Sequence, residues 1–284
     1  MKSIVVTGAS TGIGLASVKT LLARGFRVFG SVRKQADGAR LRSELGAHFT
    51  PLIFDVTDAE AVARGAAEVA AALDGETLAG LVNNAGIAVP GALLILAPQD
   101  LKRQLDVNVV SAMIVTQAFA PLLGTDKGRK GLPGRIVMMS SVGGTSATPF
   151  MGAYNASKFA LEGFSEALRR ELMLFGIDVI IVAPGQVKTP IWGKAEAMDW
   201  TGYENTPYAR PIKKMLEWVE YGDKSGLPPE AIGAAVAKAL TTAHPKTRYV
   251  LTPSPVQHFA MNHLPKRWVD RIMARMLGLT KPKP

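Results

Sequence analysis

The chain has 284 residues, 48% of them hydrophobic, and lacks cysteine, which excludes disulfides and thiolate metal sites; its four scattered histidines give no metal-ligand spacing. This length and hydrophobic content allow a large core in a single α/β domain. The net charge of +10 would suit a nucleic-acid partner, but residues 264–284 carry half of the excess positive charge. Charge concentrated in a C-terminal tail does not form a groove for a phosphate backbone, so we expect no nucleic-acid partner.

Strands and helices are predicted to alternate along the chain. Short runs rich in β-branched residues predict strands near 4–7, 27–32, 49–54, 78–82, 135–140, 177–183 and 247–251, with amphipathic stretches between most of them. Such alternation indicates parallel strands joined by right-handed helical crossovers. We therefore expect a doubly wound sheet with ligands beyond the carboxyl ends of its strands.

The first strand begins directly after Met1 and leaves no room for a signal peptide. No apolar run is expected to approach the roughly 18 residues of a membrane span. We therefore expect a cytoplasmic protein.

A glycine-rich turn follows the first strand. Residues 7–14 read TGASTGIG, with the spacing G-x-x-x-G-x-G and not G-x-G-x-x-G, and a helical pattern follows. Glycines permit a tight turn and close approach of the backbone to a pyrophosphate, and the N-terminus of a helix attracts the anion. The turn is thus a candidate site for a dinucleotide.

Tyr154 and Lys158 lie four residues apart at the start of a predicted helix, so both side chains share one face. A free tyrosine titrates near pH 10, too high for a base at neutral pH. A nearby ammonium group that stabilises the phenolate would lower that pKa and let Tyr154 exchange a proton with a substrate oxygen.

A long segment, residues 185–228, separates the sixth strand from the next helix and carries three of the four tryptophans. Long excursions inside compact domains are often functional. Two interpretations stay open here, a lid that contacts substrate and a peripheral helical hairpin with a small core of its own.

The chain ends in an amphipathic basic helix. Trp268, Ile272 and Met276 recur at helical spacing, and Arg267, Arg271 and Arg275 form another stripe. This helix would pack over a core or over the substrate cleft, dock a partner, or lie on an anionic membrane surface.

Five motifs in order resemble the short-chain dehydrogenase/reductase family across about residues 3–190. Besides TGASTGIG they are Asn83-Asn84-Ala85-Gly86, Asn108 within LDVNVV, Ser141 with Tyr154-x-x-x-Lys158, and Pro184-Gly185. The glycine spacing resembles the non-extended branch, and the whole pattern looks most like the hydroxysteroid and retinol dehydrogenases. The resemblance implies a Rossmann-type domain over residues 1–255 with a seven-stranded parallel sheet of order 3-2-1-4-5-6-7, followed by an extension over 256–284.

The resemblance also implies an NAD(P)-dependent oxidoreductase that interconverts an alcohol and a carbonyl compound with Tyr154 as the general acid and base. Ser141 would hold the substrate oxygen, Lys158 would bind the nicotinamide ribose, and Asn108 would support a water relay behind Lys158. Strand residues alternate sides, so only one of Ser140 and Ser141 can face the site, and the spacing to Tyr154 favours Ser141. The implied cofactor contacts, besides Tyr154 and Lys158, are Gly8, Ser10, Thr11, Gly12, Ile13, Gly14, Asp55, Val56, Asn83, Ala85, Gly86, Pro184, Gly185, Val187 and Thr189.

The end of the second strand bears on cofactor choice. Family members that prefer NAD usually place an acid where this sequence has Val32, and here Arg33 and Lys34 follow. Cations suit a 2′-phosphate, so NADP is favoured, with NAD as the alternative. For Asp55 an adenine contact and a role in capping the next helix are both open.

Mostly apolar residues surround the expected catalytic positions, so we expect a hydrophobic alcohol or ketone as substrate. The predicted substrate contacts are Ser141, Val142, Met151, Tyr154, Gln186 and Trp192. By resemblance a homodimer or homotetramer would form through the helices near 99–123 and 154–175. The competing hypothesis is a regulatory or scaffold protein that binds the cofactor and turns over little.

Overall fold

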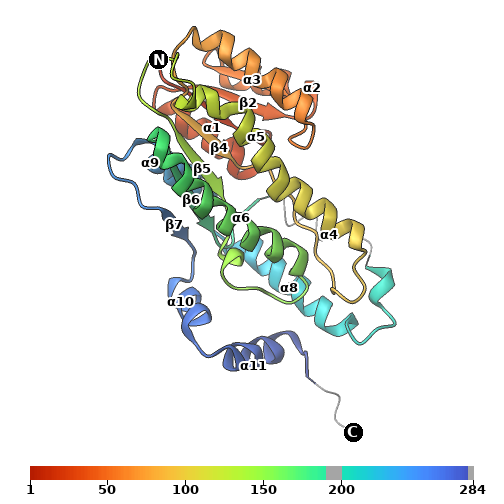
Figure 1. The fold of residues 1–284 in the computed structure, drawn as a ribbon. Helices are drawn as coiled ribbons and strands as arrows, with labels where there is room; N and C mark the ends of the chain where they lie inside the picture. Colours follow the sequence, from red (N-terminus) through yellow and green to blue (C-terminus); the bar gives the residue numbers. More distant parts are fainter. Residues whose placement is uncertain (190–199, 281–284) are drawn as a thin grey trace.

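The computed structural model describes residues 1–189 and 200–280, and its described strands form one sheet (Figure 1). All strand pairs are parallel, in the order β3-β2-β1-β4-β5-β6-β7, which confirms the predicted fold. The strands are β1 (Ser3–Val6), β2 (Arg27–Val32), β3 (Phe49–Ile53), β4 (Gly80–Asn83), β5 (Arg135–Met139), β6 (Asp178–Pro184) and β7 (Arg248–Leu251). The described helices are α1 (Gly12–Ala23), α2 (Gln35–Leu45), α3 (Ala59–Leu73), α4 (Pro98–Leu105), α5 (Ser111–Ala120), α6 (Gly152–Glu171), α8 (Ala209–Ser225), α9 (Pro229–Thr241), α10 (Pro255–His263) and α11 (Lys266–Leu277).

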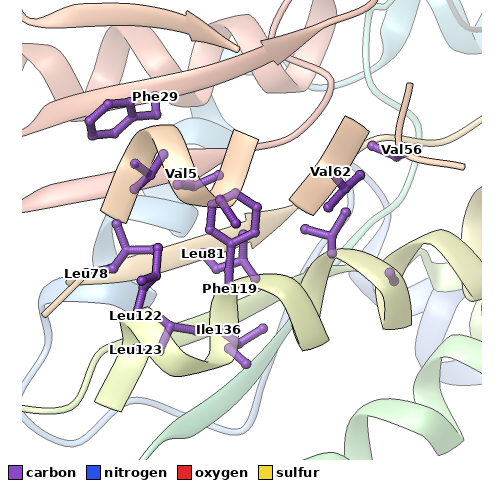
Figure 2. Packing of buried hydrophobic residues seen from close by; sticks show 14 of the residues in the cluster. Val5, Phe29, Val56, Val62, Leu78, Leu81, Phe119, Leu122, Leu123 and Ile136 are labelled. Carbon is purple, nitrogen blue, oxygen red and sulfur yellow. The ribbon is translucent and has the colours of Figure 1, made fainter. Parts of the chain in front are cut away.

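Two apolar cores lie on opposite faces of the sheet, because successive strand side chains point to opposite sides. Ile4 and Val6 pack on one face in a cluster that includes α1, α2 and α9. Val5 lies between them and packs on the other face with Phe119 of α5 and residues of α3 and α6 (Figure 2). The sheet is therefore buried on both sides, as parallel sheets generally are.

One helical run, residues 98–125, contains an 18-residue stretch that is long and apolar enough in composition to cross a membrane, with a mean hydropathy of 1.6. The expectation that no run has this length is therefore wrong. The run is apolar because it is a core helix: it joins α4, a π-helical segment η1 (Asp106–Val110), α5 and Pro121–Thr125. Its Val115, Phe119 and Leu123 are buried in the second core.

A third, smaller apolar cluster lies where α8 meets the loops before α4 and α6. Ile212, Met215 and Val219 of α8 are buried in it together with Ala92 and Phe150. The ring of Phe150 packs edge to face against Tyr208, with centroids 5.9 Å apart. The described part of the long segment therefore packs in a small core that it shares with the loops before α4 and α6, and both sequence interpretations of the segment stay predictions.

Candidate active site

A cavity of about 480 Å³ opens beyond the carboxyl ends of the central strands. Parallel doubly wound sheets bind ligands at this edge. Most of the predicted cofactor positions line this cavity, namely Gly8, Ser10, Thr11, Gly12, Ile13, Gly14, Arg33, Asp55, Val56, Ala85, Gly86, Tyr154, Lys158, Pro184, Gly185, Val187 and Thr189. Ser141 lines it as well, so the glycine-rich turn and the predicted catalytic residues share one cavity.

The turn between β1 and α1 is tight and leaves donors for an anion. Gly8 has a φ of +66°, and a side chain at Gly14 would place its Cβ 2.1 Å from the Gly8 carbonyl oxygen. The backbone N–H of Gly8 donates to the Ser31 hydroxyl at 3.1 Å. Thr11, the N-cap of α1, makes no side-chain capping bond, so the first N–H groups of the helix are open to a bound anion. These donors fit the pyrophosphate of a dinucleotide.

Thr7 joins the ends of β1 and β4 below this turn. Its hydroxyl accepts from the N–H groups of Asn84 and Ala85, both at 3.0 Å, and the Asn84 amide donates to the carbonyl oxygen of Thr7 at 2.9 Å. Asn84 thus forms part of the cavity wall. The prediction that Asn83 lines the cofactor site is wrong, because Asn83 still belongs to the strand and points into the core, where it donates to Thr116 at 3.0 Å.

Arg33 follows β2 and lines the cavity near Asp55. Burial opposes ionisation of Asp55, but hydrogen bonds from Thr57 and the charge of Arg33 outweigh it and lower the pKa of this carboxyl group. Asp55 therefore caps its own turn, and the N-cap of α3 is Asp58, which accepts from Ala61 at 2.9 Å. Lys34 is exposed and does not line the cavity, contrary to prediction, because it already precedes α2 at its N-cap.

Ser141 and Tyr154 meet beside the end of β6. The Ser141 hydroxyl accepts from the Gly143 N–H at 3.0 Å, donates to the Pro184 carbonyl at 3.3 Å and is hydrogen-bonded to Tyr154. Ser140 points the other way and donates to Glu162 at 2.6 Å. The alternation of strand side chains therefore selects Ser141 as the serine that faces Tyr154.

Lys158 lies one helical turn beyond Tyr154, with its Nζ 5.7 Å from the centroid of the Tyr154 ring. Its ammonium group donates to the Met139 carbonyl oxygen at 2.7 Å. Burial lowers the pKa of Lys158 to about 8, although the nearby Glu162 carboxylate acts in the opposite direction. Lys158 is therefore mostly charged at pH 7 and loses its charge as the pH rises through about 8.

The pKa of Tyr154 is raised, not lowered as the sequence analysis predicts. Burial disfavours the phenolate and is the dominant effect, while the hydrogen bond with Ser141 opposes it. The ammonium group of Lys158 donates its hydrogen bond to the Met139 carbonyl oxygen and does not offset the effect of burial on the Tyr154 pKa. The hydroxyl of Tyr154 is thus protonated at neutral pH.

Glu162 connects the catalytic helix to β7. Its carboxylate accepts from Arg248 Nε and from Arg248 Nη2, both at 3.1 Å, and from Ser140. The two side chains of this ion pair are mostly buried, with exposed fractions of 24% for Arg248 and 16% for Glu162. The middle of α6 is thereby fixed to the carboxyl end of β5 and to the start of β7.

Asn108 lies behind the main cavity, inside the π-helical segment. Its amide donates to Ser157 and to the carbonyl oxygen of Ile87, both at 3.0 Å, and its oxygen accepts from the N–H of Ile87 at 2.9 Å. Asn108 and Lys158 border a second cavity of about 10 Å³. A cavity of this size is at the lower limit for holding one water molecule, and the water relay through Asn108 stays a prediction.

Of the remaining predicted substrate contacts, Val142, Met151 and Gln186 do not line the cavity, and Trp192 lies outside the described residues. Phe150 has a φ of 65°, and this turn pairs the backbone of Met151 with Gly91. Sequence reasoning missed other lining residues, among them Ser31, Val107, Met139 and the cation Arg103. Arg103 is on α4, just before the motif that contains Asn108, but it is not part of that motif, so no sequence signal pointed to it.

Residues 2–200 match the family model for the short chain dehydrogenase. The NADPH-dependent 3-dehydrocapnine reductase of Ornithobacterium rhinotracheale is 37% identical over 278 residues, which cover 98% of each chain. Retinol dehydrogenase 16 of Homo sapiens is 32% identical over 286 residues, covering 96% of this chain and 87% of the human protein. The crystal structure of a short-chain dehydrogenase from Streptomyces avermitilis has a TM-score of 0.76 at 28% identity, covering 99% of this chain and 98% of the other.

Proposed function

The chain belongs to the short-chain dehydrogenase/reductase family, and from this membership we propose that it is an NADPH-dependent reductase of hydrophobic ketones. As a family member it is an NAD(P)-dependent oxidoreductase acting on alcohol and carbonyl carbons. The observation that carries the finer proposal is the shared cavity, in which the hydrogen-bonded pair Ser141 and Tyr154 lies together with the open N-terminus of α1.

The protonation of Tyr154 supports the reductive direction. Its raised pKa keeps the hydroxyl protonated at neutral pH, so Tyr154 is ready to give a proton to a carbonyl oxygen. Ser141 would turn its hydroxyl from Pro184 toward that oxygen and orient it. When bound, the nicotinamide supplies the hydride for the carbonyl carbon. One hydride and one proton convert the ketone to the alcohol, and Tyr154 is left as the phenolate beside Lys158.

Arg33 supports the preference for NADPH. It lines the cavity at the end of β2, where Val32 stands in place of an acid that would bind a ribose 2′-hydroxyl. A guanidinium group is suited to a phosphate because it offers several donors in a fixed plane. A relative described as NADPH-dependent is 37% identical to this chain.

The lining around the catalytic pair supports an apolar substrate. Val89, Val107, Met139 and Val187 border the same cavity as Ser141 and Tyr154. An apolar wall with a few polar groups is typical of sites that bind hydrophobic small molecules.

The test has two parts, fluorescence titration with NADPH and NADH and then turnover of a panel of apolar ketones. We expect tighter binding of NADPH and oxidation of NADPH with at least one ketone. Tight binding of NADPH without turnover of any carbonyl compound or alcohol would instead favour a regulatory or scaffold protein.

A further inference from the structure

The C-terminal helix α11 has an inner face that packs on the domain. Val269 and Leu277 are buried, and Met273 lies between them on the same face. Leu277 and Met273 join the third cluster with Ile212 and Met215 of α8. The helix is therefore held on α8 and is not a free tail (Figure 1).

A second apolar stripe on α11 is left uncovered. Trp268, Ile272 and Met276 follow one another at four-residue spacing, with exposed fractions of 59%, 37% and 45%. On α10, Val256 and Phe259 are also exposed. Tryptophan and other large apolar side chains exposed in one stripe usually mark an interaction surface.

A basic stripe runs along the other side of these residues. Arg267, Arg271 and Arg275 are exposed, and none of the three forms an ion pair within residues 1–189 and 200–280. At about 100° per residue, the exposed apolar stripe lies between the arginines and the buried face of the helix. The arginines can thus reach past the apolar stripe to groups at the surface it touches.

We propose that this surface, formed by the exposed apolar and basic stripes of α11, docks on an anionic lipid bilayer. The apolar stripe would enter the boundary between headgroups and acyl chains, and the unpaired arginines would bind the lipid phosphates. Charge complementarity selects this occupant, because three unpaired cations beside an apolar stripe match an anionic, apolar interface.

Docking would have a consequence for catalysis, and this consequence rests on the proposed function. The α8 helix that supports α11 also packs against Phe150, which lies just before Tyr154 in the chain. Docking would therefore hold the catalytic end of the molecule near the bilayer, where a hydrophobic ketone concentrates.

The test is co-sedimentation of the full chain with vesicles of phosphatidylcholine alone or mixed with phosphatidylglycerol. We expect binding to the anionic vesicles that weakens between about 0.1 M and 1 M salt, as the screening length falls from roughly 10 Å to 3 Å. Replacing Arg267, Arg271 and Arg275 by Gln should weaken the binding roughly a hundredfold.

The double variant Trp268→Ser with Ile272→Ser should also lose most of its vesicle binding. The control is Leu132→Ser, which changes a loop residue that is 81% exposed and should bind like wild type. All variants should retain wild-type turnover of a water-soluble ketone, which shows that they fold.

Three results would overturn the proposal: no binding to anionic vesicles, equal binding to both kinds of vesicle at both salt concentrations, or unchanged binding of the serine double variant. A larger oligomer in light scattering that this double variant disrupts would also overturn it, in favour of a second copy as the occupant. Vesicle binding needs neither cofactor nor substrate, so its outcome is independent of the proposed reaction.

Discussion

Lys158 is buried and Tyr154 is half-buried, and the loss of water around the two groups favours the neutral form of each. It raises the pKa of Tyr154 and lowers that of Lys158 to about 8. The sequence shows that the two side chains share a helical face, but burial comes from the surrounding loops and strands, so the direction of the Tyr154 shift could not be read from spacing. The result is a protonated tyrosine beside a lysine that titrates near neutral pH.

Glu162→Gln should move the alkaline limit of activity to lower pH. The Glu162 carboxylate raises the pKa of Lys158, so its loss lowers that pKa further below its present value of about 8. Lys158 is charged below its pKa, so kcat/KM for NADPH should fall near pH 8 in wild type and at lower pH in the variant. Glutamine can still accept from Ser140 but loses the ion pair with Arg248, so the melting temperature of the variant is measured together with its pH profile.

The matched control is Glu166→Gln, one turn further along α6, where an exposed glutamate pairs with Arg170. Its pH profile should follow that of wild type. An alkaline limit that stays in place or rises in Glu162→Gln would contradict the assigned role of Glu162.

Arg33→Ser should weaken the binding of NADPH and leave the binding of NADH nearly unchanged. If Arg33 binds the 2′-phosphate, losing this charged partner costs about 1.5–3 kcal/mol, so NADPH should bind roughly ten to a hundred times more weakly. Binding of NADH should change little. Lys34→Ser is the control, because Lys34 is adjacent but outside the cavity. Equal losses for both cofactors, or a larger effect of Lys34→Ser, would speak against the assignment.

At the scale of elements, the sequence predicts the strands within a few residues and their order through the family resemblance. Periodicity and motif order carry this information because each strand is a short β-branched run between helical patterns. The π-helical segment around Asn108 and the turn at Phe150 gave no such signal. The residue at which β4 ends, Asn83, decides that Asn84 borders the cavity and Asn83 does not, and the sequence pattern did not fix this residue.

Gly14→Ala and Gly163→Ala should have opposite effects on stability. At Gly14 the added Cβ would lie 2.1 Å from the Gly8 carbonyl oxygen, so we expect a loss of about 1–3 kcal/mol and much weaker cofactor binding. Gly163 is exposed within α6 with nothing within 4 Å of the added Cβ. There alanine should stabilise by about 0.5–1 kcal/mol. The melting temperatures of the two variants test both predictions. An unchanged melting temperature for Gly14→Ala would contradict this account of the turn, and a lower one for Gly163→Ala would contradict the prediction for α6.

At the scale of the whole molecule, α5 and α6 leave an outer apolar face. Val110, Met113 and Phe159 are each 46% exposed. We infer that a second copy of the chain covers this face, in agreement with the helices predicted from the family resemblance.

The likeness to retinol dehydrogenases is confirmed by 32% identity to retinol dehydrogenase 16.

Light scattering after size exclusion should therefore give a dimer or tetramer for wild type. The double variant Met113→Glu with Phe159→Glu should give a smaller species, because association would bury the new charges. Leu132→Glu, in the loop before β5 and outside the apolar face formed by Val110, Met113 and Phe159, should assemble like wild type. A monomeric wild type, or an unchanged mass in the double variant, would exclude this interface.

The central claim is that Tyr154 gives the proton that completes reduction of a ketone. The most direct test is NADPH oxidation by Tyr154→Phe with a ketone that wild type reduces. Removing only the hydroxyl should lower turnover by roughly 10²–10⁴-fold, the usual contribution of general acid catalysis, and leave the NADPH dissociation constant unchanged. Turnover like that of wild type would contradict the claim.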